Sequence, residues 1–245
     1  MEAGPGPGSA ASRADGRNNL QIRTLICERG LLHRADGSAR WCQDKTCVVA
    51  AIYGPKTTLG RNEDPEQAVV EVVFKPKSGV YRYNAPGQTE NLIQKIIRNA
   101  VQGVFVASLH PRTAVQVVIQ VVRDEGSVLS CALNATCAAL VDAGVLLHNM
   151  FAAVSCAIDK QTGALLLDPD ASEEKDALAV GSFAFCASGE LTDSGSRLVT
   201  SEAILVSSIH GSMDIQQYLT MLELARQGCQ RIAEFTRLSL DKVFS

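Results

Sequence analysis

The first third of the chain alternates hydrophobic and polar positions in the manner of β-strands. Runs rich in β-branched residues are separated by Gly, Pro and Asp, which commonly form turns. The Asp36-Gly37 pair is typical of a tight hairpin turn, so the strands on either side of it are predicted to pair. We therefore predict a mostly antiparallel sheet with strands over residues 21–26, 39–42, 46–53 and 68–74.

The hydrophobic period then changes to steps of three and four residues, which predicts a helix over residues 88–108. Pro111 ends this pattern, and a long β-branched run predicts a central strand over residues 112–122. Directly after this strand, the turn Gly126-Ser127 leads into a second helical pattern. The strand, turn and helix together form the junction where the sequence most strongly suggests a binding site.

The second half of the chain repeats this order of strands followed by a helix. A long amphipathic C-terminal helix begins near Ile215 and extends to about Leu238. Two rounds of strands and then helices favour an α+β fold in which mixed sheets pack against helices. The strands predicted in this half cover residues 152–158, 164–167, 181–186 and 203–208.

Composition limits the chain to one ordinary domain. It has 245 residues, 46% of them hydrophobic, which is enough to bury a substantial core. Residues 1–19 contain Gly, Pro, Ser and Ala with few large apolar side chains, so we predict a disordered tail there and a single domain over 20–245. The net charge of −3 excludes a global attraction to polyanions, and any nucleic-acid contact requires a local basic patch.

The cysteines favour a reducing environment. No two of them have the CxxC spacing of zinc or dithiol sites, and several lie within apolar runs, so they are predicted to be core thiols. No apolar run approaches the roughly 18–20 residues of a membrane helix, which predicts a soluble intracellular protein. The eight cysteines are Cys27, Cys42, Cys47, Cys131, Cys137, Cys156, Cys186 and Cys229.

Gly126 and Ser127 are candidate phosphate-binding residues. Backbone N–H groups at the start of a helix attract anions, and the Ser127 hydroxyl adds a further donor. The alternative is that Ser127 simply caps the helix that follows it.

An acidic cluster follows the strand predicted at 164–167. Asp168, Asp170 and Asp176 are candidate catalytic carboxylates, and with Glu173 and Glu174 they could hold a divalent metal ion such as magnesium or supply a general acid. The alternative is a solvated loop followed by the start of a helix, where acidic residues are common.

Basic residues on three predicted elements could converge into a patch that follows a phosphate backbone. Tyr81 and Tyr83 lie close to this group in sequence and could stack on bases. Alternatively, each charge is an ordinary surface residue. The predicted RNA-binding residues are Lys75, Lys77, Arg98 and Arg112.

The block over residues 109–145 resembles the RNase PH family, which includes the ring subunits of the eukaryotic RNA exosome. It contains His110-Pro111-Arg112, the strand at 117–122 and the segment 124–127. The similarity extends from about residue 20 to the C-terminal helix. It implies an RNase PH-like fold, a hetero-oligomeric ring of RNase PH-like subunits, 3′-to-5′ processing and decay of single-stranded RNA, and a place in the nucleus, nucleolus and cytoplasm.

The resemblance also implies that phosphorolysis is weak. Val128 lies where the family has an arginine that binds phosphate, and Val180 lies where a catalytic aspartate is expected. By contrast, Arg98 and Arg112 match positions that contact RNA in the family. We therefore predict a structural, RNA-contacting subunit in which strong phosphorolysis is absent.

Other interpretations remain open at this point. The chain could be a weak exoribonuclease that uses inorganic phosphate through Gly126, Ser127 and Arg98. It could instead be a magnesium-dependent hydrolytic nuclease that uses the carboxylates between Asp168 and Asp176. It could also act as a homodimer outside the exosome.

Overall fold

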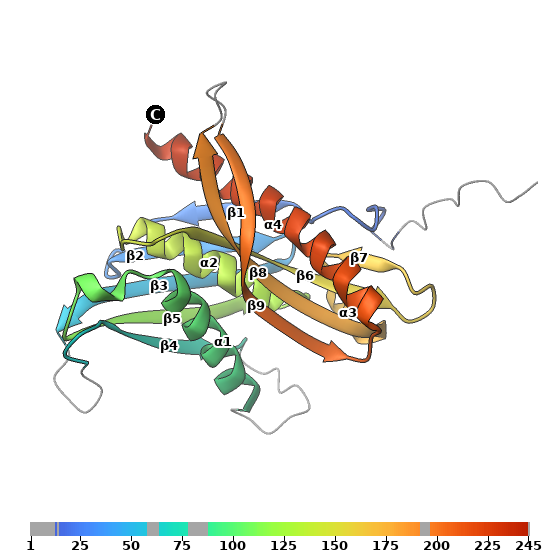
Figure 1. Cartoon of the computed structure of the whole chain (residues 1–245), viewed down its shortest axis with the longest axis horizontal. Helices are drawn as coiled ribbons and strands as arrows, with labels where there is room; N and C mark the ends of the chain where they lie inside the picture. Colours follow the sequence, from blue (N-terminus) through green and yellow to red (C-terminus); the bar gives the residue numbers. More distant parts are fainter. Residues whose placement is uncertain (1–12, 14, 58–63, 78–87, 192–196, 245) are drawn as a thin grey trace, which may run out of the picture.

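In the described part of the chain, the first β-sheet has five strands, and one of its strand pairs is parallel. The computed structural model describes residues 13, 15–57, 64–77, 88–191 and 197–244. Strands β4 and β5 run parallel because helix α1 (Gln88–Val104) carries the chain back between them, whereas all other neighbours are antiparallel. The strand order is β1 (Leu25–Arg29), β2 (Gly37–Gln43), β3 (Thr46–Thr57), β5 (Thr113–Arg123) and β4 (Val69–Lys75) (Figure 1).

The second sheet is antiparallel throughout and is covered by the C-terminal helix α4 (Ile215–Phe244), drawn in red in Figure 1. A short helix, α3 (Ala171–Asp176), connects two of its strands. The strand order is β7 (Leu165–Leu167), β6 (Met150–Asp159), β8 (Ala177–Leu191) and β9 (Arg197–Gly211).

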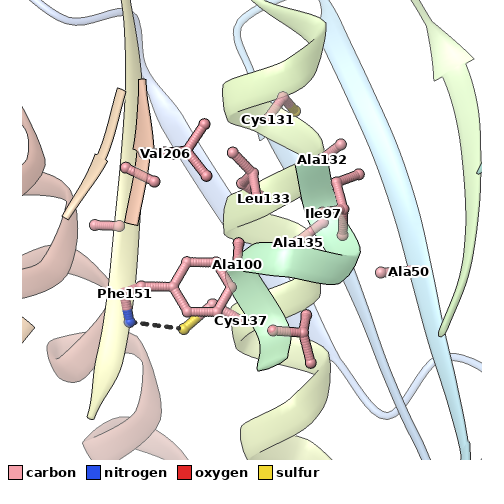
Figure 2. Packing of buried hydrophobic residues seen from close by; sticks show 14 of the residues in the cluster. Ala50, Ile97, Ala100, Cys131, Ala132, Leu133, Ala135, Cys137, Phe151 and Val206 are labelled. Carbon is pink, nitrogen blue, oxygen red and sulfur yellow. Dashed lines mark hydrogen bonds between the residues drawn. The ribbon is translucent and has the colours of Figure 1, made fainter. Parts of the chain in front are cut away.

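Helix α2 (Val128–Asp142) lies between the two sheets and forms the centre of the core. It contacts β2 and β3 of the first sheet and β6 of the second. A helix that is buried on all sides needs apolar or small residues around its whole circumference, and α2 is rich in Ala, Leu and Cys. Figure 2 shows its residues Cys131 and Leu133 packed with Ile97 of α1, Phe151 of β6 and Val206 of β9.

Asn134 is one of the buried polar residues of α2, and it fixes the helix against the second sheet. Its side-chain amide donates to the Ala153 carbonyl at 2.9 Å and accepts from the Ala153 N–H at 2.8 Å. Both polar atoms of the amide are therefore satisfied, so burial of Asn134 costs little.

The α+β class with mixed sheets and helices is confirmed, but two details at the N-terminus differ from the prediction. The strand predicted at 21–26 begins only at Leu25, because its partner β2 ends at Gln43. Beyond that residue, the Asp44 N–H of the turn donates to the Thr24 carbonyl at 2.9 Å, but the strand pairing does not continue. Gly37 is the first residue of β2 and not part of a turn. A Cβ atom there would lie 2.3 Å from the Ala143 backbone nitrogen, so the glycine permits close packing against the end of α2.

Other elements differ from the prediction only in length. The helix predicted over 88–108 ends at Val104 and is followed by a 3₁₀ turn, η1 (Ala107–Leu109). The strands predicted at 181–186 and 203–208 are parts of the longer β8 and β9. Among the helices that the structure describes, none has the length and apolar character to cross a membrane.

The structure describes only the last part of the segment predicted to be a disordered tail, and the disorder itself stays a prediction. Residues 1–12 and 14 of the predicted 1–19 segment lie outside the described residues, but Arg13 is described and is only 7% exposed. Its guanidinium donates to the Leu167 carbonyl at 2.8 Å and pairs with Glu173. Arg13 thus attaches this part of the segment to the end of β7 and to α3.

Candidate functional site

Ser127 joins β5 to α2, and both of its donors are used within the chain. Its backbone N–H donates to Glu174 Oε1 at 2.6 Å, and its hydroxyl donates to the Pro169 carbonyl at 2.8 Å. Ser127 has a left-handed backbone (φ 57°), and its side chain makes no capping hydrogen bond to α2. The alternative that Ser127 caps α2 with its hydroxyl is therefore wrong, because the backbone turns that hydroxyl towards Pro169.

Gly126 allows the β5–α2 loop to pack directly against the loop before α3. Its φ is +93°, a conformation that side-chain-bearing residues rarely adopt. A Cβ atom on Gly126 would lie 2.5 Å from the Asp170 carbonyl carbon and 2.6 Å from the Ala171 nitrogen. The two loops thus meet backbone to backbone at this glycine.

Asp168 is buried and paired with Arg23. The carboxylate accepts from Arg23 Nη2 at 2.7 Å, from Nε at 3.0 Å and from the Arg23 backbone N–H at 3.0 Å. The Asp168 side chain is 0% exposed and that of Arg23 is 4% exposed. Burial alone lowers the pKa of Arg23, but the hydrogen bonds and charge of Asp168 outweigh it, and the pKa is raised.

The interpretation of the acidic cluster as a solvated loop is therefore wrong for Asp168. Its carboxylate is buried and accepts three hydrogen bonds from Arg23. A carboxylate held in this way is not available to bind a metal ion or to transfer a proton to a substrate.

The same arginine supports the β5–α2 loop. Arg23 donates to the Glu125 carbonyl at 3.2 Å and to the Gly126 carbonyl at 3.3 Å. The Thr46 hydroxyl donates to the Gly126 carbonyl at 2.8 Å. Arg23 therefore connects Asp168 to the candidate phosphate-binding loop through buried hydrogen bonds.

Asp170 caps helix α3. Its carboxylate accepts from the backbone N–H groups of Ser172 and Glu173, and the Glu173 side chain accepts from the Asp170 N–H, which completes a capping box. Burial tends to raise the pKa of Asp170. The hydrogen bonds from Ser172 and Glu173 outweigh this effect, so the pKa lies below its usual value.

The third candidate carboxylate, Asp176, is exposed at the end of α3. It lines a polar cleft of about 370 Å³, together with Asp170, Lys45 and Lys175. Within the described part of the chain, no three His, Cys, Asp or Glu side chains are placed to hold a metal ion. The structure therefore separates the three candidates: Asp168 is buried, Asp170 is a helix cap and Asp176 lies at the cleft.

The predicted RNA-binding residues do not form one patch. Lys75 ends β4 and lies beside Gln120, whereas Arg112 precedes the first residue of β5, so about 25 Å of strand separates them. Lys77 follows Lys75, and Arg98 is exposed on α1. The expected convergence of these residues is not observed. Tyr81 and Tyr83 lie outside the described residues.

The two valines identified from the sequence lie on different elements. Val128 is the first residue of α2 and packs against the core. Val180 lies on β8, opposite Ala157 of β6 and His210 of β9.

Sequence reasoning missed Arg23 and Thr46, whose side chains donate hydrogen bonds to the backbone carbonyls of the β5–α2 loop. Both lie in or beside predicted strands, where an arginine or a threonine is ordinary, and no local pattern indicates their contacts. Glu174 was recognised only as one member of an acidic cluster. Its contact with Ser127 depends on the packing of two loops that are far apart in sequence.

The sequence and the fold both match known proteins. The 3′ exoribonuclease family of the RNase PH type, domain 1, matches residues 21–145. The Exosome complex exonuclease RRP46 homolog of Arabidopsis thaliana is 39% identical over 238 residues, which cover 94% of this chain and 96% of the relative. The Saccharomyces cerevisiae Exosome complex component RRP46 is 30% identical and covers 90% of this chain and 97% of its own length.

Two solved structures share the fold. The crystal structure of rice Rrp46 has a TM-score of 0.80 at 36% identity and covers 94% of this chain and 100% of its own. The Archaeoglobus fulgidus exosome with RNA bound to the active site has a TM-score of 0.74 at 16% identity and covers 91% of this chain and 92% of its own, which shows the fold alone. These matches confirm the resemblance stated from the sequence, and the chain belongs to the RNase PH family.

Proposed function

We propose that the chain is a core ring subunit of the RNA exosome, in which it supplies architecture and RNA contacts rather than phosphorolysis. The names of its relatives support the ring assignment, because the Arabidopsis, rice and yeast proteins are named as RRP46 members of the exosome complex. The absence of strong phosphorolysis is supported by one observation above all, the Glu174 carboxylate at the N-terminus of α2.

The Glu174 carboxylate takes the place that a phosphate would need. A phosphate at a helix N-terminus accepts hydrogen bonds from backbone N–H groups. Here the Ser127 N–H donates to Glu174, and the negative charge of Glu174 opposes a second anion. The Ser127 hydroxyl is bonded to Pro169, and Val128 has no charge to offer phosphate. Donors and charge both disfavour phosphate at this loop.

The surface of the second sheet supports assembly with other subunits. Strand β9 is an edge strand, and its residues Ile204 and Ile209 are 48% and 37% exposed. Ile215 and Leu219 of α4 are also exposed. An unpaired strand edge with exposed apolar residues is normally covered by a partner. Light scattering of the isolated chain should therefore give a mass above 26.1 kDa. A stable monomer at micromolar concentration would contradict the ring assignment.

The RNA contacts are proposed to be weak and independent of base sequence. Replacing Arg98 and Arg112 together by Ala should lower both the affinity for single-stranded RNA and the slope of log affinity against log salt. The matched variant replaces Lys75 and Lys77 by Ala. Because about 25 Å of strand separates Lys75 from Arg112, the lysine variant tests a region of the surface away from Arg112. A surface whose variant leaves the slope unchanged does not contact RNA.

The catalytic part of the proposal is tested with the full chain and single-stranded RNA, with and without inorganic phosphate and magnesium. Phosphorolysis releases nucleoside diphosphates, whereas metal-assisted hydrolysis releases monophosphates and stops with a chelator. We expect neither product above background. Diphosphate release at the rate of active family members would overturn the proposal. Magnesium-dependent monophosphate release would instead identify the chain as a hydrolytic nuclease.

A further inference from the structure

Two cysteines face each other across the hairpin of β2 and β3. In the antiparallel register, Cys42 lies directly opposite Cys47. The two-residue turn Asp44-Lys45 connects the strands, and Asp44 has the positive φ of 51° that such turns require. Because the turn is short and paired on both sides, it holds the two cysteines in one register.

This register brings the two thiols within reach of a disulfide. Directly opposite residues of an antiparallel pair have Cα atoms about 4.5 or 5.5 Å apart, and their side chains lie on the same face of the sheet. Disulfides form when the Cα atoms are about 4.4 to 6.8 Å apart. Cys42 and Cys47 therefore meet the backbone requirement without a change in the fold.

The pair differs from the other cysteines in its surroundings. Both thiols are free, with Cys42 buried and Cys47 partly exposed. Burial and the adjacent Cys42 thiol raise the pKa of Cys47 to about 11, while Arg40 opposes this rise. The pKa of Arg40 is itself raised, first by a hydrogen bond with Cys42. Arg40 thus offsets part of the rise in the pKa of Cys47, and it is the positive charge nearest to the thiolate that thiol exchange requires.

We propose that Cys42 and Cys47 form a reversible cross-strand disulfide by exchange with a low-molecular-weight disulfide such as oxidised glutathione. Cys47, the more exposed thiol, loses its proton and attacks the glutathione disulfide, which forms a mixed disulfide and releases one glutathione. Cys42 then loses its proton and attacks the Cys47 sulfur, which releases the second glutathione. Two protein thiols lose two electrons in total, and one glutathione disulfide gains them to become two thiols.

The disulfide would lie next to the support of the β5–α2 loop. Thr46 is adjacent to Cys47, and its hydroxyl donates to the Gly126 carbonyl at 2.8 Å. A covalent link between the strands restricts the opening of this hairpin. Oxidation is therefore expected to restrict motion at the start of β3, where Thr46 donates its hydrogen bond to the β5–α2 loop.

The test uses the full reduced chain, which is incubated with oxidised glutathione, alkylated and digested with trypsin. Trypsin cleaves after Arg40, Lys45 and Lys56, so a disulfide between Cys42 and Cys47 joins the peptides 41–45 and 46–56. We expect this joined pair, lighter by two hydrogens than the sum of its parts, together with loss of alkylation at both cysteines. A reductant should separate the pair and restore alkylation.

Two controls distinguish a specific disulfide between Cys42 and Cys47 from general oxidation of thiols. Cys186 is partly exposed like Cys47, but it lies opposite Phe151 and should gain at most a glutathione adduct. A Cys47→Ser variant should lose the joined peptides and leave the reactivity of Cys186 unchanged. If the folded chain keeps both thiols open to alkylation, or if the joined peptides appear only after denaturation, the proposal is wrong.

Discussion

The two strand-to-helix junctions of the site satisfy their helix N-termini in opposite ways. Before α3, the cap is local: Asp170 accepts from Ser172 and Glu173, and Glu173 returns a hydrogen bond. Before α2, Ser127 makes no side-chain cap, and the acceptor for its N–H is Glu174, which comes from the other junction. The short surface helix is thus capped by residues of its own segment, whereas the N–H that precedes the buried helix donates to a residue from elsewhere in the fold.

This difference shows where the candidate phosphate site is controlled. The loop at α2 has the glycine and the serine that a phosphate-binding turn needs, yet its donors are used by the loop at α3. Arg23 binds both loops, through Asp168 on one side and the Gly126 carbonyl on the other. The chemistry available at one junction is therefore set by the packing of the other.

The largest effect is expected when the link between the two junctions is broken. Asp168→Asn leaves the buried guanidinium of Arg23 without its counter-charge, which should cost about 3–5 kcal/mol of unfolding free energy. Asparagine tolerates the φ of 52° at this position, so backbone strain is not the cause. Urea unfolding measures the loss.

The matched control is Asp176→Asn, an exposed carboxylate that should change stability by less than about 0.5 kcal/mol. Equal losses in both variants would show that Arg23 does not depend on Asp168.

The backbone contact between the junctions is tested by Gly126→Ala. A Cβ atom there meets the Asp170 carbonyl carbon at 2.5 Å and must adopt a φ of +93°, so we expect a loss of about 2–4 kcal/mol. Gly163→Ala is the control, because Gly163 also has a positive φ but has no atom within 4 Å of its Cβ position. The control should lose only about 1 kcal/mol of unfolding free energy, because it has the backbone strain without the steric contact. Thermal unfolding of the two variants therefore separates the cost of the strain from the added cost of the contact.

Local features of the sequence predicted most of the fold, including the start of α2 after the Gly126-Ser127 turn. The periodicities located the central strand β5, α1 and α4, because each depends on residues close in sequence. The α3 start lies within the acidic segment, where Asp170 and Glu173 have the spacing of a capping box. By contrast, the start of β1 was misplaced because it is set by where β2 turns.

The site was less predictable because its contacts join distant segments. Asp168 and Asp170 are two residues apart and chemically alike, yet one is buried against Arg23 and the other is a surface cap. Nothing in their immediate sequence distinguishes them. The same holds for the basic residues, since the parallel pairing of β4 with β5 places Lys75 and Arg112 at opposite ends of the sheet. Membership of the family was recognisable from the long block over residues 109–145, whereas the hydrogen bonds of the site were not.

A smaller effect is expected at the local cap. Asp170→Ala should cost about 1 kcal/mol, because the N–H groups of Ser172 and Glu173 lose their acceptor. Hydrogen bonds lower the pKa of Asp170 in the folded chain, so its contribution is present above the unfolded value near pH 3.9 and is lost as the pH falls through the lower folded pKa. The difference between parent and variant should therefore shrink in acid. Urea unfolding across this pH range checks it, and a constant difference would mean that the Asp170 charge does not stabilise the cap.

The smallest change in stability, and the sharpest test of the difference between the junctions, is expected for Glu174→Ala. Removing the carboxylate costs only about 0.3–1 kcal/mol, since a charge at a helix N-terminus contributes little when it is partly exposed. The variant nevertheless leaves the Ser127 N–H without that acceptor, so inorganic phosphate should now raise the melting temperature.

The controls are the parent chain and Asp176→Ala, which alters the same helix without touching Ser127. Phosphate should not raise the melting temperature of either control. Chloride at matched ionic strength should affect all three chains alike. If phosphate stabilises all three chains equally, the loop at α2 is open to anions despite Glu174. If it stabilises none, the closure does not depend on this carboxylate, and the bond from Ser127 to Pro169 is sufficient to exclude phosphate.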